Sequence, residues 1–70
     1  MNGWEESKNK ILKEINLTNK SIIDIGCGNG WFLSWCSNYI SQGIGIDPSS
    51  SQITIAKQKI KNLNIKFKLF

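Results

Sequence analysis

The stretch Ser21–Asp47, SIIDIGCGNGWFLSWCSNYISQGIGID, decides the expected fold. It opens with Ile22 to Ile25, a run rich in β-branched residues that ends at a glycine and is therefore typical of a buried strand. An apolar segment from Trp31 to Tyr39 follows at helical spacing. Gly43 to Asp47 then returns as a second strand. A strand, a turn, a helix and a strand in this order predict one unit of a parallel α/β sheet.

The five residues between the first strand and the helix are Gly26-Cys27-Gly28-Asn29-Gly30, with glycine at alternate positions. Such a run neither continues a strand nor stabilises a helix, so it predicts a tight turn that a ligand can approach closely. We expect its backbone N–H groups to supply hydrogen-bond donors and its missing side chains to supply room.

An acid follows this turn at the spacing that a ribose-binding site requires. Asp47 lies 21 residues after Gly26, at the end of the second predicted strand. A glycine turn at the end of one strand and an acid at the end of the next are typical of cofactor sites in open α/β sheets. A carboxylate can accept two hydroxyl protons in a bidentate contact.

The segment before this unit predicts an amphipathic helix over roughly Glu5 to Asn16. Trp4, Ile11, Leu12 and Ile15 recur near helical spacing, with charged residues between them. Its apolar side is thin, so we expect it to pack against the sheet or a neighbouring segment rather than lie on a membrane.

The segment after Asp47 predicts a helix and a third strand. Ser49 and Gln52 fit a capping box at the start of the helix. The expected buried stripe of this helix is Ile53, Ala56, Ile60 and Leu63. Ile65 to Leu69 alternates apolar residues with lysine, which is typical of a strand at the edge of a sheet.

Together these patterns predict an α/β fold, a Rossmann-like parallel sheet fragment with the order helix-β-α-β-α-β and the spatial strand order 3-2-1. We expect residues 1–20 to form an N-terminal amphipathic helix and linker, and residues 21–70 to form the cofactor-binding half of a larger, truncated domain.

Composition excludes several other classes of protein. The chain has 70 residues, a net charge of +4, two cysteines and no histidine. A Cys–His catalytic pair is therefore impossible, and two cysteines make neither a disulfide framework nor a zinc site. We expect no metal site and no membrane-spanning segment, and a reduced, cytoplasmic protein.

The charges are divided between the flanks and the middle of the chain. All nine basic residues are lysines, and between Ser21 and Ala56 the only charged residues are Asp24 and Asp47. We interpret the flanking lysines as solvated faces rather than a nucleic-acid surface, because no arginine is present to read a base.

The two acids favour one cofactor class over another. A dinucleotide fingerprint requires a small residue where Trp31 stands, and Asp24 beside the turn would repel a pyrophosphate. S-adenosylmethionine has no phosphate and carries a sulfonium and an ammonium, so an acid at the turn favours its binding.

At this point the sequence resembles a known family. Asp24 to Gly30 resembles the first motif of class I S-adenosylmethionine-dependent methyltransferases, and Gly45 to Ser49 resembles the second, with the likeness covering Ser21 to Phe70. The resemblance implies that the three turn glycines line the methionine part of the cofactor and that Asp24 helps to hold its amino group. The resemblance also implies that Asp47 binds both ribose hydroxyls and that Pro48 lies against the adenine. The expected cofactor-binding residues are Asp24, Gly26, Cys27, Gly28, Asn29, Gly30, Asp47 and Pro48.

The sequence also departs from the family pattern. Family members have a longer, seven-stranded fold, and the segments that carry catalytic and substrate-orienting residues follow the third strand. We therefore assign no catalytic residue, and we expect a cofactor-binding part that is inactive alone and self-associates through the unpaired edge of its first strand. In a complete enzyme it would serve methyl transfer to an unidentified acceptor. The alternatives are a non-catalytic module that needs a second chain, an inactive truncated product, and a nucleotide-binding oxidoreductase fragment.

Structural roles are expected for five residues near the motifs, and for Cys27 this replaces a role as a nucleophile. Gly43 and Gly45 are interpreted as strand and connector glycines, Cys27 as a small filler of the turn, and Trp31 and Trp35 as packing residues.

Overall fold

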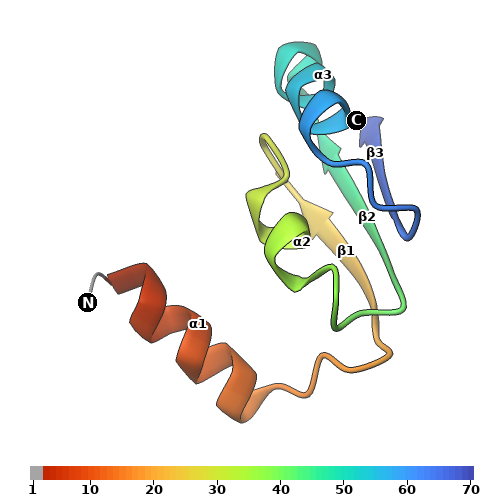
Figure 1. The fold of residues 1–70 in the computed structure, drawn as a ribbon. Helices are drawn as coiled ribbons and strands as arrows, with labels where there is room; N and C mark the ends of the chain where they lie inside the picture. The colour runs from red at the N-terminus through yellow and green to blue at the C-terminus, as the bar shows by residue number, and fades with distance from the viewer. Residues whose placement is uncertain (1–2) are drawn as a thin grey trace.

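The computed structural model describes residues 3–70 and contains a three-stranded parallel sheet (Figure 1). Its elements are α1 (Gly3–Glu14), β1 (Ser21–Ile25), α2 (Trp31–Cys36), β2 (Gln42–Asp47), α3 (Ser50–Lys59) and β3 (Ile65–Leu69). The strands lie in the order β1-β2-β3, and both pairs are parallel. The predicted fold class, the element order and the spatial order 3-2-1 are therefore confirmed.

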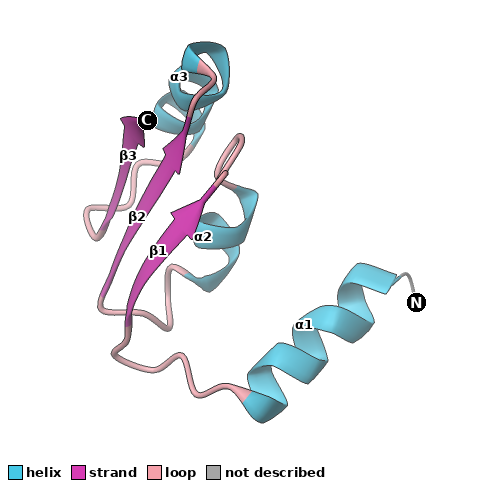
Figure 2. Cartoon of the chain, turned by 180° about the vertical axis from the view of Figure 1, so that it is seen from behind, coloured by secondary structure: helices cyan, strands magenta, loops and turns pink. Residues whose placement is uncertain are grey.

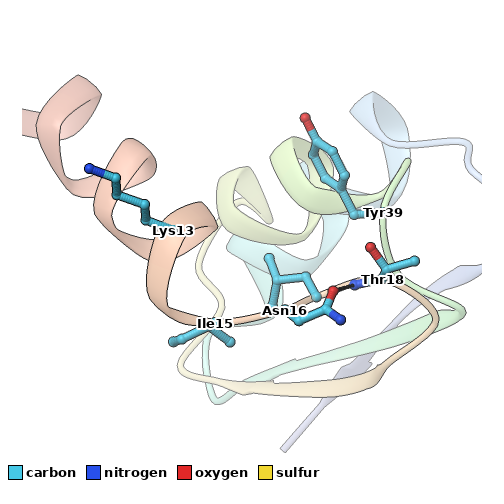
Figure 3. Close-up of a pocket in the computed structure, with 6 residues that line it drawn as sticks. Lys13, Ile15, Asn16, Thr18 and Tyr39 are labelled. Carbon is cyan, nitrogen blue, oxygen red and sulfur yellow. Dashed lines mark hydrogen bonds between the residues drawn. The ribbon is translucent and has the colours of Figure 1, made fainter.

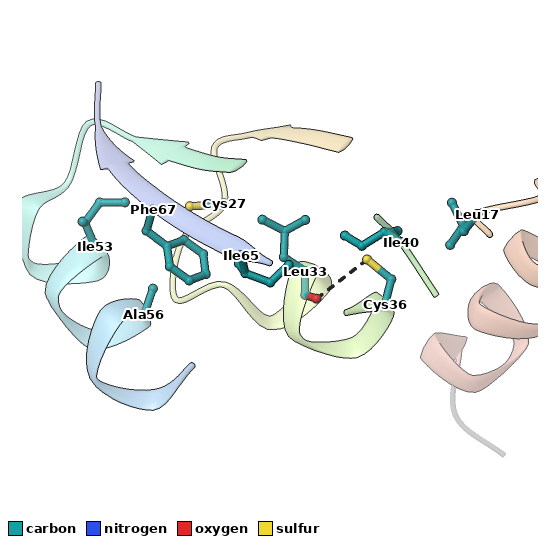
Figure 4. Packing of buried hydrophobic residues seen from close by; sticks show 9 residues of the cluster. All are labelled: Leu17, Cys27, Leu33, Cys36, Ile40, Ile53, Ala56, Ile65 and Phe67. Carbon is teal, nitrogen blue, oxygen red and sulfur yellow. Dashed lines mark hydrogen bonds between the residues drawn. The ribbon is translucent and has the colours of Figure 1, made fainter. Parts of the chain in front are cut away.

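The hydrophobic core lies between one face of this sheet and the helices α2 and α3 (Figure 4). Leu33 of α2 and Ala56 of α3 are completely buried, and they pack with Ile65 and Phe67 of β3. The buried cluster consists of Leu17, Cys27, Leu33, Cys36, Ile40, Ile53, Ala56, Ile65 and Phe67. Burial of these side chains positions β1 and β2 side by side, with their carboxyl ends at one edge.

Helix α1 contacts this core through its C-terminal part. Ile11 is half-buried and packs against the core cluster, and Leu17 in the following linker belongs to it. The expected packing of this helix against its own chain is thus confirmed for Ile11. Trp4 and Leu12, expected on the same side of the helix, have side chains outside the described part of the structure. None of the helices within residues 3–70 has both the length and the apolar composition needed to cross a bilayer.

Helix α2 is shorter than its apolar pattern predicts, because it ends at Cys36 and not at Tyr39. The hydroxyl of Ser37 donates to the carbonyl oxygen of Ser34 at 2.9 Å, and the Ser37 N–H group points to the same oxygen at 3.4 Å. A serine hydroxyl that takes a backbone acceptor competes with helical hydrogen bonds. The turn after Cys36 is therefore tighter than an α-helix.

Helix α3 begins as predicted and ends earlier than predicted. Ser49 accepts a hydrogen bond from the N–H group of Gln52 at 3.3 Å, which is half of the expected capping box. At the other end Ile60 has extended backbone angles, φ −112° and ψ 108°. Leu63 therefore lies beyond the end of the helix and is 99% exposed, so the prediction that it is buried is wrong.

Candidate cofactor site

The glycine turn is held against the end of β2 by backbone hydrogen bonds. The N–H groups of Gly26 and Cys27 both donate to the carbonyl oxygen of Ile46, at 2.8 and 3.0 Å. The turn then closes on itself, because the N–H group of Gly30 donates to the carbonyl oxygen of Cys27 at 3.0 Å. The turn thus lies directly beside the acid that follows Ile46.

That acid, Asp47, ties two loops together with its carboxylate. Its Oδ2 accepts the N–H group of Gly28 at 3.0 Å, and its Oδ1 accepts the N–H group of Ser49 at 2.8 Å. In a full capping box the N–H group of Ser49 would donate to the side chain of Gln52. Here it donates to Asp47 instead. One side chain thus fixes both the turn after β1 and the start of α3.

These bonds bear on one expectation from the sequence. The N–H groups of Gly26, Cys27, Gly28 and Gly30 all donate to acceptors within the protein. The expectation that the turn supplies hydrogen-bond donors to a ligand stays a prediction.

The three turn glycines are required for different reasons. All have a positive φ, 78° at Gly26, 57° at Gly28 and 84° at Gly30, which side chains rarely adopt. A Cβ at Gly26 would meet no atom within 4 Å, and one at Gly28 would meet only Gln52 Oε1 at 3.9 Å. A Cβ at Gly30, by contrast, would stand 2.7 Å from side-chain atoms of Ile60 and Phe67. Gly26 and Gly28 thus border open space, whereas Gly30 packs against the core.

Sequence reasoning missed the role of the two glycines in β2. A Cβ at Gly45 would stand 2.8 Å from Cδ1 of Phe67 and 2.9 Å from Sγ of Cys27, and one at Gly43 would stand 2.9 Å from Leu33 Cδ2. The absent side chains let α2 and the turn approach the sheet closely. The signal was present in the alternation Gly-Ile-Gly-Ile, which puts both glycines on one face of the strand.

The other residues of the turn shape it from within. Cys27 is 2% exposed, so its interpretation as a small filler is confirmed. The side-chain oxygen of Asn29 accepts the N–H group of Trp31 at 3.2 Å and thereby satisfies a donor at the start of α2. Trp31 itself is 54% exposed and makes an edge-to-face contact with Phe32, at 5.8 Å between ring centroids.

The electrostatics of this edge are negative. Asp24 is half-buried in β1, and burial raises the pKa of its carboxyl group. The pKa of the Cys27 thiol is also raised, mainly by burial and further by the negative charges of Asp24 and Asp47. Both acids therefore lie near the turn. The two carboxylates favour a cationic group beside them. On another side of the turn, Lys59 of α3 lines a hollow together with Asn29.

A hollow of about 280 Å³ lies elsewhere, where the strands begin (Figure 3). It is lined by Lys13, Ile15, Asn16, Leu17, Thr18 and Tyr39. These residues precede β1 and β2 in the chain, whereas the glycine turn and Asp47 stand where those strands end. The hollow therefore contains none of the predicted site residues.

A parallel α/β sheet with a glycine turn after one strand and an acid at the end of its neighbour defines the Rossmann-like class of cofactor-binding proteins. Comparison with known proteins narrows this class. Residues 2–70 match the family model described as a methyltransferase domain. The chain belongs to this family, and the predicted resemblance to S-adenosylmethionine-dependent methyltransferases is confirmed.

Two curated relatives are similar in sequence. Protein 235L of Invertebrate iridescent virus 6, named as a methyltransferase, is 40% identical over 63 residues. The match covers 86% of this chain and 24% of the viral protein. CRG1 of Saccharomyces cerevisiae, named as an S-adenosylmethionine-dependent methyltransferase, is 43% identical over 51 residues, covering 73% of this chain. The match spans only 18% of CRG1. The chain therefore corresponds to a small part of either relative.

Solved structures agree in fold. An S-adenosylmethionine-dependent methyltransferase from Mesorhizobium loti superposes with a TM-score of 0.81 at 25% identity. The superposition covers 97% of this chain and 32% of the Mesorhizobium loti chain. A second one, from Anabaena variabilis, has a TM-score of 0.78 at 28% identity, covering 100% and 30% of the two chains. The cofactor of this family is S-adenosylmethionine, as predicted from the residues of the turn.

Proposed function

We propose that this chain binds S-adenosylmethionine across the glycine turn and the end of β2. The observation that carries the proposal is the hydrogen bond from the Gly28 N–H group to the Asp47 carboxylate, 3.0 Å long. Because turn and acid are in contact, a single ligand can touch both. The family of the chain supports this ligand.

In this proposal Asp47 binds the ribose. Each of its oxygens accepts one N–H group, from Gly28 and from Ser49. A carboxylate oxygen has two lone-pair sites, so each oxygen keeps one acceptor site for a hydroxyl group. Pro48, which is exposed beside Asp47, supplies a flat surface for the adenine.

The methionine part of the cofactor lies along the turn. Gly26 and Gly28 provide the space, since a Cβ at either position would project into an open region. Cys27, Asn29 and Gly30 contribute by shaping the turn from within. Asp24 supplies a partly desolvated negative charge for the amino group, where attraction to a cation is stronger than in water.

The proposed reaction requires more than these residues. In a protein that carries the complete domain, an acceptor nucleophile attacks the sulfonium methyl group, and catalysis rests largely on alignment of donor and acceptor. We assign the residues that bind the methyl acceptor, and the catalytic residues, to segments outside these 70 residues.

Three further proposals concern organisation. We propose that residues 21–70 form the cofactor-binding unit and that residues 1–20 form a helix and linker attached to it. Within residues 3–70, β1 has a neighbour on one side only, so we propose self-association through its other edge when the chain is alone. Two buried free thiols, Cys27 and Cys36, favour a reducing compartment such as the cytoplasm.

Isothermal titration of the 70-residue protein tests the ligand. We expect S-adenosylmethionine to bind and NAD to show no saturable heat, because its pyrophosphate meets Asp24 and Asp47. Asp47→Ala removes a carboxylate at the site, and Glu14→Ala removes an exposed one on α1 as the matched control. Loss of binding in both variants, or binding of NAD alone, would overturn the proposal.

A further inference from the structure

The side chain of Gln52 is released from the helix cap in which the sequence places it. In a capping box this side chain would accept the N–H group of Ser49. The carboxylate of Asp47 accepts that N–H group instead, at 2.8 Å. Only the backbone of Gln52 remains in the cap, because its N–H group donates to the Ser49 hydroxyl at 3.3 Å. The carboxamide of Gln52 is therefore left for another partner.

This carboxamide reaches the space beside the glycine turn. Within residues 3–70, Oε1 of Gln52 is the one atom that a Cβ at Gly28 would meet within 4 Å, at a distance of 3.9 Å. Gly28 in turn donates its N–H group to Asp47 at 3.0 Å. Figure 2 shows that the loop after β1 and the start of α3 stand at the same end of the sheet. The turn, the acid and the carboxamide thus border one space.

The chemistry of the carboxamide complements that of the acid. Gln52 is half-buried, and within residues 3–70 its side chain has no hydrogen-bond partner. A glutamine side chain carries two N–H donors and one carbonyl acceptor, whereas an ionised aspartate offers acceptors alone. Gln52 therefore brings to this space the side-chain donors that Asp47 lacks.

We propose that Gln52 is a further cofactor-binding residue, whose carboxamide donates a hydrogen bond to the 3′-hydroxyl oxygen of the cofactor ribose. This inference rests on the proposed function, in which Asp47 binds the ribose and the methionine part lies along the turn. A ribose hydroxyl donates one hydrogen bond and can accept others. A hydroxyl that donates to Asp47 can therefore accept an N–H group of Gln52 at the same time.

The position of Gln52 selects the 3′-hydroxyl over the 2′-hydroxyl. The 3′-hydroxyl stands on the ring carbon next to the one that carries the sulfonium arm, so it is the hydroxyl nearer to the methionine part. Gln52 borders Gly28, where that part of the cofactor is proposed to lie. A site that hydrogen-bonds a ligand hydroxyl discriminates against analogues without it, because its polar group is then left unpaired. Gln52 is in this sense a determinant of specificity for the ribose.

Substitution by methionine tests the contact. Gln52→Met keeps an unbranched side chain of similar length and a good helix former, and it removes the donors. Isothermal titration of the 70-residue protein with S-adenosylmethionine should show about fivefold weaker binding in this variant, as expected for the loss of one neutral hydrogen bond. Gln58→Met is the matched control, since Gln58 is exposed on the same helix, and it should bind like the wild type.

Deoxy analogues of the cofactor identify the hydroxyl. 3′-Deoxy-S-adenosylmethionine should bind the wild type and Gln52→Met equally, because this ligand lacks the partner of the carboxamide. 2′-Deoxy-S-adenosylmethionine should keep the full difference between the two proteins. A role of Gln52 in shaping the turn alone would weaken all three ligands alike, so this cycle of variants and ligands separates contact from shape.

The possible results distinguish this inference from the proposed function. If S-adenosylmethionine binds the wild type and Gln52→Met with equal affinity, or if all three ligands lose affinity equally, the role of Gln52 is overturned and the proposed ligand stands. A difference that persists with the 3′-deoxy analogue and vanishes with the 2′-deoxy analogue would overturn the choice of hydroxyl. No binding of S-adenosylmethionine to the wild type would overturn both proposals. Circular dichroism is expected to report an unchanged fold in both glutamine variants.

Discussion

The carboxylate of Asp47 accepts the N–H group of Gly28 at 3.0 Å and so joins the turn after β1 to the end of β2. The same side chain accepts the N–H group of Ser49 at 2.8 Å. The residue proposed to bind ribose thus also holds the loops on either side of it. Charge-assisted hydrogen bonds of this kind contribute more to stability than neutral ones.

Replacement of Asp47 separates these two roles. Asp47→Ala should weaken binding of S-adenosylmethionine by about 2 kcal/mol or more and lower the free energy of unfolding by about 1–3 kcal/mol, because two N–H groups lose their acceptor. Calorimetric titration and urea denaturation measure the two effects. An unchanged affinity would contradict the ribose role, and an unchanged stability would contradict the role of Asp47 in holding the loops.

The turn glycines predict an order of stabilities. Gly26→Ala places a side chain at φ 78° but in open space, so it should cost about 1 kcal/mol of backbone strain. Gly30→Ala adds contacts of 2.7 Å with Ile60 and Phe67 and should cost about 1–3 kcal/mol more. Urea denaturation of the two variants provides the comparison, each being the control for the other. Equal midpoints would show that the core contact at Gly30 is unimportant.

A bulkier change at Gly28 addresses the ligand. Gly28→Val should abolish binding of S-adenosylmethionine, since a β-branched side chain at φ 57° both strains the turn and fills the space beside it. Thermal unfolding with and without ligand measures the effect, and Gly26→Ala serves as the milder comparison. Neither NADH nor another phosphate ligand should restore ligand protection in this variant. Protection of the wild type by NADH and not by S-adenosylmethionine would contradict the assignment.

The raised pKa of Asp24 predicts a pH dependence. A protonated carboxyl group attracts the cofactor ammonium less, so affinity should fall as pH falls, beginning at a higher pH than for an ordinary aspartate. For folding the sign is opposite, because a raised pKa favours the folded state at acidic pH and this contribution is lost as pH rises through the folded-state pKa. Titrations at several pH values should give a flat profile in Asp24→Asn. A profile that keeps the wild-type slope in this variant would exclude Asp24 as its source.

Local patterns were sufficient to predict the sheet. β1 follows from its β-branched run and the glycine after it, and β3 from its alternating lysines. The strand order then follows because short connections join neighbouring parallel strands. The start of α3 was equally local, since Ser49 and Gln52 lie three residues apart.

Features set by contacts between distant segments escaped prediction. The N–H groups of the turn are taken by Ile46 and Asp47, whose position beside the turn exists only in the folded sheet. The close approach at Gly45 likewise depends on Cys27 and Phe67, which lie far from it in sequence. The side chain of Asn64, just before β3, donates to the carbonyl oxygens of Ser37 and Ile40 at 3.0 and 3.3 Å, which is another contact between distant segments.

The most direct test of the proposed site is an amide NMR titration of the 70-residue protein with S-adenosylmethionine. We predict that shift changes concentrate at residues 26–30 and 47–49, and that Asp47→Ala removes them while Glu14→Ala does not. Changes centred instead on the hollow beside Tyr39, or none at saturating ligand in a folded sample, would contradict the account.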